Sequence, residues 1–515
     1  MAENRYPNLT WQQTSLGRWD REVDEAERFY TLLAKSCEGS GRMFFAITGF
    51  VSVSVQTADS ITEEVAKRLE EALRSAWLRL RYDYPTIASQ VKYDEHEKVW
   101  KKLYTPFYED DVEVQTKEWL GKTFVPINPG VSGLDWCNSD PPAPKVPTLF
   151  VITPTDTKSL EDNVLRRDLV IRSPHDTMDG IGTLQLLNNL LAHAAQAYEN
   201  PGAWKPPPPG SEFRNLSPPI RVAASIPPIL SLKLQQDLQD LIAGNAALRQ
   251  EVDVLSVPFK SGPTVPGKHQ RIALEIPASD TARLLSASKS LGATITHIYH
   301  AAIAIAVRDF QKAGPRARTG RYITYSLINE RPKCNGDYST SKHAAAVYHS
   351  VSGNHLAIDL TIPSDTDEAM NEEQAREEFR AVVQQMKSYY HSIRDSPDNL
   401  ALSPSFWSMG TPHVPDPTST NIPIPPPNNT PSVSISSMGV VDKIIRPQHG
   451  ALKADNPWVT GEELGTGLGL FLGTWKGNLN LSAAYNDAWH DKETVEEFVK
   501  HCQDVVWKGL ALNEE

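Results

Sequence analysis

Residues 175–180 read His-Asp-Thr-Met-Asp-Gly and separate a segment typical of a strand from one typical of a helix. Before them, residues 168–173, with Leu169-Val170-Ile171 at their centre, predict a strand, which Pro174 ends. After them, apolar residues recur at helical spacing from Gly180 to about Tyr198. We therefore expect this stretch at a strand-to-helix junction, where a loop side chain can reach a cleft.

His175 is the candidate general base of this junction. An unperturbed imidazole has a pKa near ~6.5, so it can take the proton of an alcohol that attacks a thioester. Asp179 is expected to hold the loop by pairing with an arginine elsewhere in the chain. Gly180 is expected to let the backbone turn tightly into the helix. The alternative is that these three residues fell at this spacing by chance.

Length and composition describe a globular protein, and the strand and helix patterns along the chain predict mixed α/β structure. A chain of 515 residues favours two domains and hence a cleft between them. The net charge of -12 argues against nucleic-acid or anionic membrane partners, which need a basic surface. The four cysteines lie far apart, without a CxxC pair, and no apolar stretch reaches membrane-spanning length. We expect a cytoplasmic protein with reduced thiols.

A proline-rich region divides the chain. Residues 201–231 contain Trp204-Lys205 followed by four prolines, a composition that stiffens the chain and disfavours helix. We therefore expect an N-terminal subdomain over residues 1–205, a linker over 206–260 and a C-terminal subdomain over 261–515.

Local patterns predict elements in both halves. Ser60–Glu63 reads as a capping box that opens a helix to about Tyr82. Lys476-Gly477 lies between two alternating runs and predicts a hairpin, and the loop over residues 411–431 is long enough to cover a site. The other expected strands are residues 42–55, 93–104, 149–153, 271–276, 322–328 and 432–436, and the other expected helices are residues 279–291, 296–312, 367–394 and 493–510.

The pattern His175-x-x-x-Asp179-Gly180 resembles the signature of the superfamily that holds nonribosomal condensation domains, plant BAHD acyltransferases and fungal acetyltransferases. Three further segments resemble the fungal trichothecene 15-O-acetyltransferases: Trp11–Trp19, Gly39–Phe45 and Trp136–Pro142. This resemblance covers nearly the whole chain. It implies two chloramphenicol-acetyltransferase-like domains, with an active-site channel between them that acetyl-CoA enters from one side and an alcohol from the other.

The resemblance also implies roles for individual residues. His175 would take the hydroxyl proton, so that the alkoxide attacks acetyl-CoA directly without an acyl-enzyme. Asn329–Pro332 resembles the segment that supplies the arginine partner of the motif aspartate, which makes Arg331 the candidate. Ser434–Gly439 resembles the strand that lines the channel and can offer a donor to the oxyanion, although it reads equally well as a plain sheet strand.

Two departures from the family patterns narrow the function. Condensation domains carry a second histidine just before the motif, where this chain has Pro174. The Asp-Phe-Gly-Trp-Gly segment of plant BAHD enzymes is absent from the sequence. The fungal branch is therefore favoured, although a free-standing condensation-type enzyme with a carrier-bound donor stays open. An inactive family member that binds a terpenoid or a partner protein stays open too.

Three other sequence patterns give weaker evidence about function. Gly465–Gly469 has the wrong glycine spacing for a dinucleotide loop. His297 and His300 share a helix face but lie in an apolar stretch without a third ligand, so we expect core histidines and no metal. No motif cradles phosphate, so the residues that bind the CoA phosphates cannot be named.

The sequence thus predicts an acetyl-CoA-dependent O-acetyltransferase that acts on a hydroxyl of a fungal sesquiterpenoid, by resemblance a trichothecene at its 15-position. We expect a monomer without a tightly bound cofactor, whose partners are the terpenoid alcohol and acetyl-CoA as co-substrate.

Overall fold

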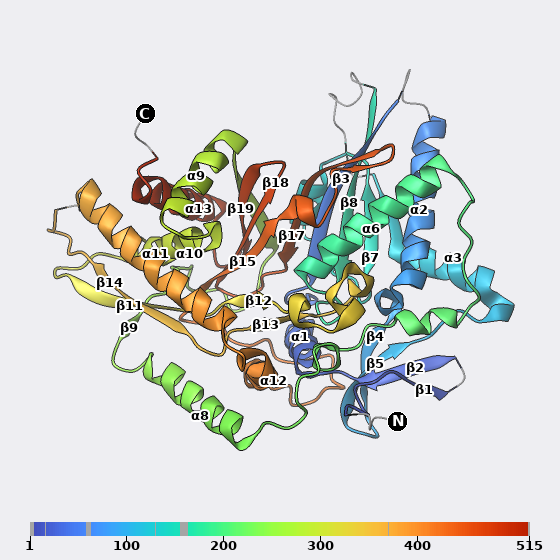
Figure 1. Ribbon diagram of the computed structural model, residues 1–515, viewed down its shortest axis with the longest axis horizontal. Helices are drawn as coiled ribbons and strands as arrows, with labels where there is room; N and C mark the ends of the chain where they lie inside the picture. The colour runs from blue at the N-terminus through green and yellow to red at the C-terminus, as the bar shows by residue number, and fades with distance from the viewer. Residues whose placement is uncertain are drawn as a thin grey trace.

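The computed structural model describes residues 5–15, 17–57, 63–128, 130–154, 163–368 and 370–512. Within them, two lobes stand side by side, each built on its own sheet with helices against it (Figure 1). The expected capping box at residues 60–63 falls largely outside the described part of the chain, which resumes at the first residue of helix α2.

A mixed sheet forms the core of the lobe on the right of Figure 1. Its described strands, in spatial order, are β16 (Gln448–His449), β17 (Leu452–Gly461), β3 (Ile47–Gln56), β8 (Val164–Ser173), β7 (Thr148–Ile152) and β6 (Phe124–Ile127). Helices α2 (Glu63–Asp83) and α6 (Gly180–Glu199) pack against each other and share one hydrophobic core with these strands. The helical stripe that begins at Leu184 therefore faces the sheet, as its spacing predicts.

The other lobe has a sheet of four described strands: β10 (His269–Ile276), β19 (Asn478–Asn486), β18 (Leu468–Trp475) and β15 (Val433–Val440). Its helices are α9 (Ala278–Ser290), α10 (Ile295–Asp309), α11 (Glu372–Arg394) and α13 (Lys492–Gly509). From His297 to Arg308 every residue of α10 is buried, which makes this helix the centre of the lobe's core. No single described helix could cross a membrane by length and apolarity, although α9 and α10 pass that test as a bent pair.

Two features cut across the expected division of the chain. Strand β17 comes late in the sequence, yet it pairs antiparallel with β3 in the first lobe. Helix α8 (Leu232–Ala247) occupies part of the expected linker 206–260. The three-part division itself stays a prediction.

The remaining described elements lie mostly in the lower half of Figure 1. The small sheets contain β1 (Gln12–Ser15), β2 (Arg18–Glu22), β5 (Val99–Tyr104) and β4 (Gln90–Asp94); β14 (Leu356–Ile362), β11 (Arg318–Thr324) and β9 (Asp253–Val254); and β12 (Leu327–Asn329) with β13 (His349–Val351). The remaining α-helices are α1 (Glu25–Ser36), α3 (Val112–Thr123), α4 (Gly133–Asn138), α7 (Ile220–Ala223) and α12 (Asn399–Gly410).

Several expected strands differ from the structure. The strand expected from Arg42 begins only at Ile47, because Phe45 takes a positive φ of 56° and turns the chain. The segment 93–104 is the β4–β5 hairpin, and 322–328 belongs to two strands, β11 and β12. The hairpin at Lys476-Gly477 is confirmed, with φ of 49° and 84°, since paired positive values match the twist of the strands.

Candidate active site

A cavity of about 620 Å³ lies between the two lobes and has His175 in its wall. His175 is in the turn that joins β8 to α6, which is the junction that the sequence predicts. Tyr30 and Phe45 are among the lining residues from the first part of the chain, whereas most of the wall comes from segments after residue 240. Among these later lining residues are Arg331, His349, Trp407, Ser434, Ser436 and Phe471.

The His175 ring is clamped face to face against Tyr30 of α1. The two ring centroids lie 3.8 Å apart and the planes differ by 3°. Nδ1 of His175 is buried and makes no hydrogen bond with another residue, so Nε2 is the nitrogen available to a ligand. Burial lowers the pKa of His175 to about 3, helped by the nearby His349 and opposed by its own backbone carbonyl and Asp179. The ring is therefore a neutral base that can accept a proton.

Tyr30 links His175 to a second histidine of the cavity. Its hydroxyl and Nε2 of His349 lie 3.0 Å apart, and the His349 ring lies edge-on to Trp407. Burial lowers the pKa of His349 as well, and Arg331 adds to that shift. The parallel Tyr30 ring, itself held by His349, thus fixes the plane of the His175 ring.

Asp179 borders the cavity, but both of its carboxylate oxygens are taken up by hydrogen bonds within the protein. Its Oδ1 accepts the backbone N–H of Gly182 at 2.8 Å and so caps α6. Its Oδ2 accepts from Nη1 of Arg331 and from the backbone N–H of Tyr348, each at 2.8 Å. Although burial raises the pKa of Asp179, Arg331 and these hydrogen bonds hold it below its usual value. The sequence names Arg331 as the candidate partner, and the structure places it there.

The expected role of Gly180 is wrong, and the glycine that the fold requires is Gly182. Gly180 is the first residue of α6, its φ is not positive, and a Cβ there would make only ordinary contacts, the nearest at 3.5 Å to Val459. A Cβ on Gly182 would lie 2.1 Å from the carbonyl oxygen of Ala344 and 2.8 Å from Nη2 of Arg331. Gly182 therefore makes room for the Arg331–Asp179 pair, while Gly180 lines the cavity.

A buried ionic cluster holds the other side of the loop. Nζ of Lys102 donates to the backbone carbonyl of Asp176 and to Oε1 of Glu27, each at 2.5 Å. Glu27 also accepts both terminal nitrogens of Arg21, at 2.6 and 2.7 Å, while Thr31 donates to Oδ2 of Asp176 at 2.9 Å. The residue after His175 is therefore fixed at both its backbone and its side chain.

Strand β15 lines the cavity as the sequence analysis anticipates. Ser434 and Ser436 are alternate residues of β15 and both reach the wall. The Ser437 hydroxyl accepts a hydrogen bond from Thr296 at 2.9 Å. In contrast, the loop over residues 411–431 contributes nothing to the wall and packs Val414 and Ile422 against Leu32 of α1.

Neither α1 nor His349 is among the site features predicted from the sequence. Asp24 and Glu27 form a capping box at the start of α1, a spacing that is readable from sequence and could have located this helix. No local signal points to His349, which reaches the cavity only through the pairing of β13 with β12.

The two histidines of α10 are structural. His300 is buried and hydrogen-bonds Tyr390 and Thr324, and His297 caps the helix through Thr294. Within the described ranges, no group of three or more His, Cys, Asp or Glu side chains could hold a metal ion.

These lobes and the cavity between them define the fold class: a mixed α/β structure of the two-lobed type of condensation domains and chloramphenicol-acetyltransferase-like acyltransferases. The chain aligns with TRI3 trichothecene 15-O-acetyltransferase from Fusarium sporotrichioides at a TM-score of 0.76 and 17% identity, over 98% of each chain. It aligns with the first condensation domain of the calcium-dependent antibiotic synthetase at a TM-score of 0.58 and 14% identity, over 95% of this chain and 96% of the other.

Three relatives found by sequence indicate the class of enzyme. The chain is 25% identical to O-acetyltransferase pigM of Monascus ruber over 98% of its length and 88% of the relative. It is 21% identical to acetyltransferase pigO of the same organism, over 98% and 99%. It is 23% identical to azaphilone biosynthesis cluster protein M of Aspergillus terreus, over 68% and 78%. No family model matches. By homology the chain is an acetyltransferase.

Proposed function

We propose that this protein transfers an acetyl group from acetyl-CoA to a hydroxyl of a bulky, largely apolar product of fungal secondary metabolism. The neutral His175 imidazole, stacked on Tyr30 inside a 620 Å³ cavity, is the observation that carries the proposal. The cavity wall is mostly aromatic and aliphatic, which suits a polycyclic acceptor rather than a sugar or an amino acid.

The proposed reaction is a direct transfer. Nε2 of His175 takes the hydroxyl proton as the alcohol oxygen attacks the thioester carbonyl carbon. The tetrahedral intermediate then collapses, the carbon–sulfur bond breaks, and the imidazolium protonates the leaving thiolate. Burial disfavours the imidazolium by itself, whereas the oxyanion that forms beside it offsets that cost. The hydroxyls of Ser434 and Ser436 are candidate donors to that oxyanion.

Two acceptor classes have support. An azaphilone-type polyketide alcohol is favoured by the Aspergillus terreus relative, which is named for azaphilone biosynthesis. A trichothecene alcohol, acetylated at the 15-position, is favoured by the likeness to TRI3 over nearly the whole fold. We rank the azaphilone class first because sequence relatives share more than the fold. The monomeric state and cytoplasmic location stay predictions.

The test is incubation with acetyl-CoA and a panel of azaphilone and trichothecene alcohols, with free thiol and product mass as readouts. We expect one class to be acetylated, and His175→Ala to lower the rate by about 10²-fold or more while the unfolding temperature holds. An acyl-carrier thioester in place of acetyl-CoA tests the condensation-type alternative. A His175→Ala variant as fast as the wild type would contradict the proposed mechanism.

A further inference from the structure

A second cavity, of about 570 Å³, adjoins the cavity of His175. We call it the outer cavity; Met438 and Phe471 line both spaces. Its wall is formed by β3, β8 and β17 of the first lobe and by β10, β18 and β19 of the second. A ligand that extends from His175 past Met438 and Phe471 would therefore enter it.

Arg271 of β10 is the unusual group of the outer cavity. Its side chain is only 3% exposed, and its guanidinium stacks over Trp458 at 4.3 Å. Nη2 makes one long hydrogen bond, 3.4 Å, to the Asn480 side chain, and Nε is buried without a partner. Burial lowers the pKa of Arg271 to about 10. Removing a charge from water in this way is costly unless an anion compensates it.

The other cations of the outer cavity already have carboxylate partners. Arg166 pairs with Asp168 at 3.0 Å, and Lys476 pairs with Asp455 at 2.8 Å. Glu275 also lines the cavity and accepts a hydrogen bond from Asn478. No described carboxylate forms an ion pair with Arg271. The site is thus built for an anion that comes from outside the protein.

The stretch of sheet between the two cavities carries small side chains. Ser434, Gly469, Ala484 and Arg271 lie side by side in register on β15, β18, β19 and β10. The row spans three strand spacings, about 14 Å in total. Ser434 borders the cavity of His175 at one end, and Arg271 borders the outer cavity at the other. Glycine and alanine fill the middle, so a thin extended chain can cross.

We propose that the outer cavity receives the phosphate-bearing end of coenzyme A and that the Arg271 guanidinium binds one of its phosphate groups. The pantetheine arm would cross that stretch of sheet at Gly469 and Ala484, which brings the thioester to His175. Trp475, which also lies in the outer cavity wall, offers a ring face to the adenine. This inference rests on the proposed function, which supplies the coenzyme.

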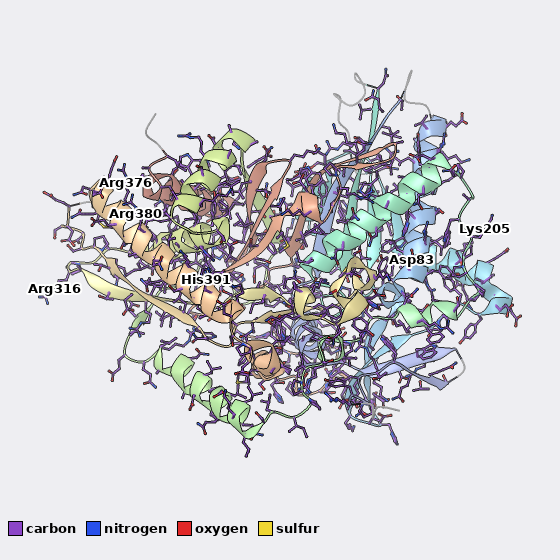
Figure 2. The ribbon with its side chains drawn as sticks, viewed as in Figure 1. Asp83, Lys205, Arg316, Arg376, Arg380 and His391 are labelled. Carbon is purple, nitrogen blue, oxygen red and sulfur yellow. The ribbon has the colours of Figure 1, made fainter. Side chains whose placement is uncertain are left out.

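The test compares Arg271→Met with Arg316→Met, the same change at an exposed arginine on the far side of the second lobe (Figure 2). Titration calorimetry gives the Kd for CoA, and kinetics give KM for acetyl-CoA and for S-acetyl-N-acetylcysteamine, a thioester without phosphates. We expect Arg271→Met to raise both CoA constants about tenfold or more, because a charge-assisted hydrogen bond is lost. The short donor should react equally well with both variants and the wild type.

A CoA Kd within twofold of the wild type would overturn the proposal. So would an equal loss with the short donor, since that result means Arg271 acts on the fold. If Arg271→Met does not fold, Arg271→Gln keeps a polar group near Asn480 and is measured instead. A wild type that binds CoA but acetylates no alcohol would sink the proposed function alone, whereas a wild type that does not bind CoA would sink both.

Discussion

At the scale of single residues, the surroundings of His175 change its acid–base behaviour from that of a free imidazole. Burial against Tyr30 lowers its pKa to about 3, so the neutral form persists well below the usual titration range. A neutral imidazole does not have to lose a proton before it can act as a base. In the proposed reaction, the hydroxyl and the thioester therefore meet an imidazole that is neutral at any physiological pH.

This shift predicts a flat pH profile. The pKa is lowered, so the base form is kept as pH falls and is lost only as pH approaches the folded-state value. In a Glu463→Gln background, which removes a carboxyl of the cavity wall whose pKa is raised to about 7, we expect kcat/KM for the acceptor to change less than about twofold between pH 6 and 8, where an unperturbed histidine would titrate. Steady-state rates after preincubation at each pH check this. An inflection near the ordinary imidazole value would contradict it.

The glycines of the motif region predict a second pair of outcomes. Gly182→Ala places a methyl group against the Ala344 carbonyl and Arg331, so we expect a loss of about 1–3 kcal/mol in unfolding free energy and lower activity. Gly180→Ala is the matched control, because its Cβ has ordinary room, and its unfolding free energy should match the wild type. Urea denaturation of both variants measures the two unfolding free energies. Equal stability of the two variants would refute the assignment.

At the scale of elements, α1 presents one face to the catalytic loop. Glu27, Tyr30 and Thr31 are spaced by three and four residues, so they lie on the same side of the helix. Through Lys102, Glu27 holds the Asp176 carbonyl; Thr31 holds the Asp176 carboxylate; Tyr30 holds the His175 ring. The helix therefore positions His175, the proposed base, through contacts with the ring and with the next residue.

The Tyr30 stack predicts a difference between two substitutions. Tyr30→Phe keeps the ring face and loses only the hydrogen bond with His349, so kcat should fall by a few-fold at most. Tyr30→Leu removes the flat surface, frees the imidazole to tilt, and should lower kcat by about tenfold to a hundredfold. Calorimetry should give the same CoA Kd for both variants. If the two variants have equal kcat, the ring plane is set by other contacts.

At the scale of the whole molecule, three buried carboxyl groups make stability depend on pH. Burial raises the pKa of Asp24, Glu462 and Glu463 to about 7 each. A carboxyl whose folded pKa is raised favours the folded state below its unfolded pKa, and that stability is lost as pH rises through the folded value. Glu463 borders the cavity of His175, so the stability lost when its carboxyl ionises is lost at the site itself.

Glu463→Gln should remove one such contribution. Relative to the wild type, its unfolding free energy should increase between pH 5 and 8, by up to about 3 kcal/mol. Glu113→Gln, at an exposed position of α3, is the control and should show no such pH-dependent difference. Urea denaturation at both pH values gives the comparison. A constant difference across pH for Glu463→Gln would contradict the argument.

Much of the fold was readable because local patterns reflect local physics. The helix that begins at Gly180 and the hairpin at Lys476-Gly477 occur where apolar spacing and turn chemistry place them. The strand prediction was wrong at Phe45, because the positive φ of this residue is set by a partner outside the segment. Its N–H donates to the Glu462 carbonyl. Helix α1 was missed despite a readable capping box at Asp24 and Glu27.

By itself the sequence determined which histidine is the candidate base, its place at a strand-to-helix junction, and the class of fold, because the motif and its flanking periodicities lie within one short stretch. Only the tertiary structure decided what surrounds that base. Tyr30, Lys102 and His349 lie far from it along the chain and meet it through packing and strand pairing. The same holds for Arg271, whose missing counter-charge becomes visible only once every neighbour is in place.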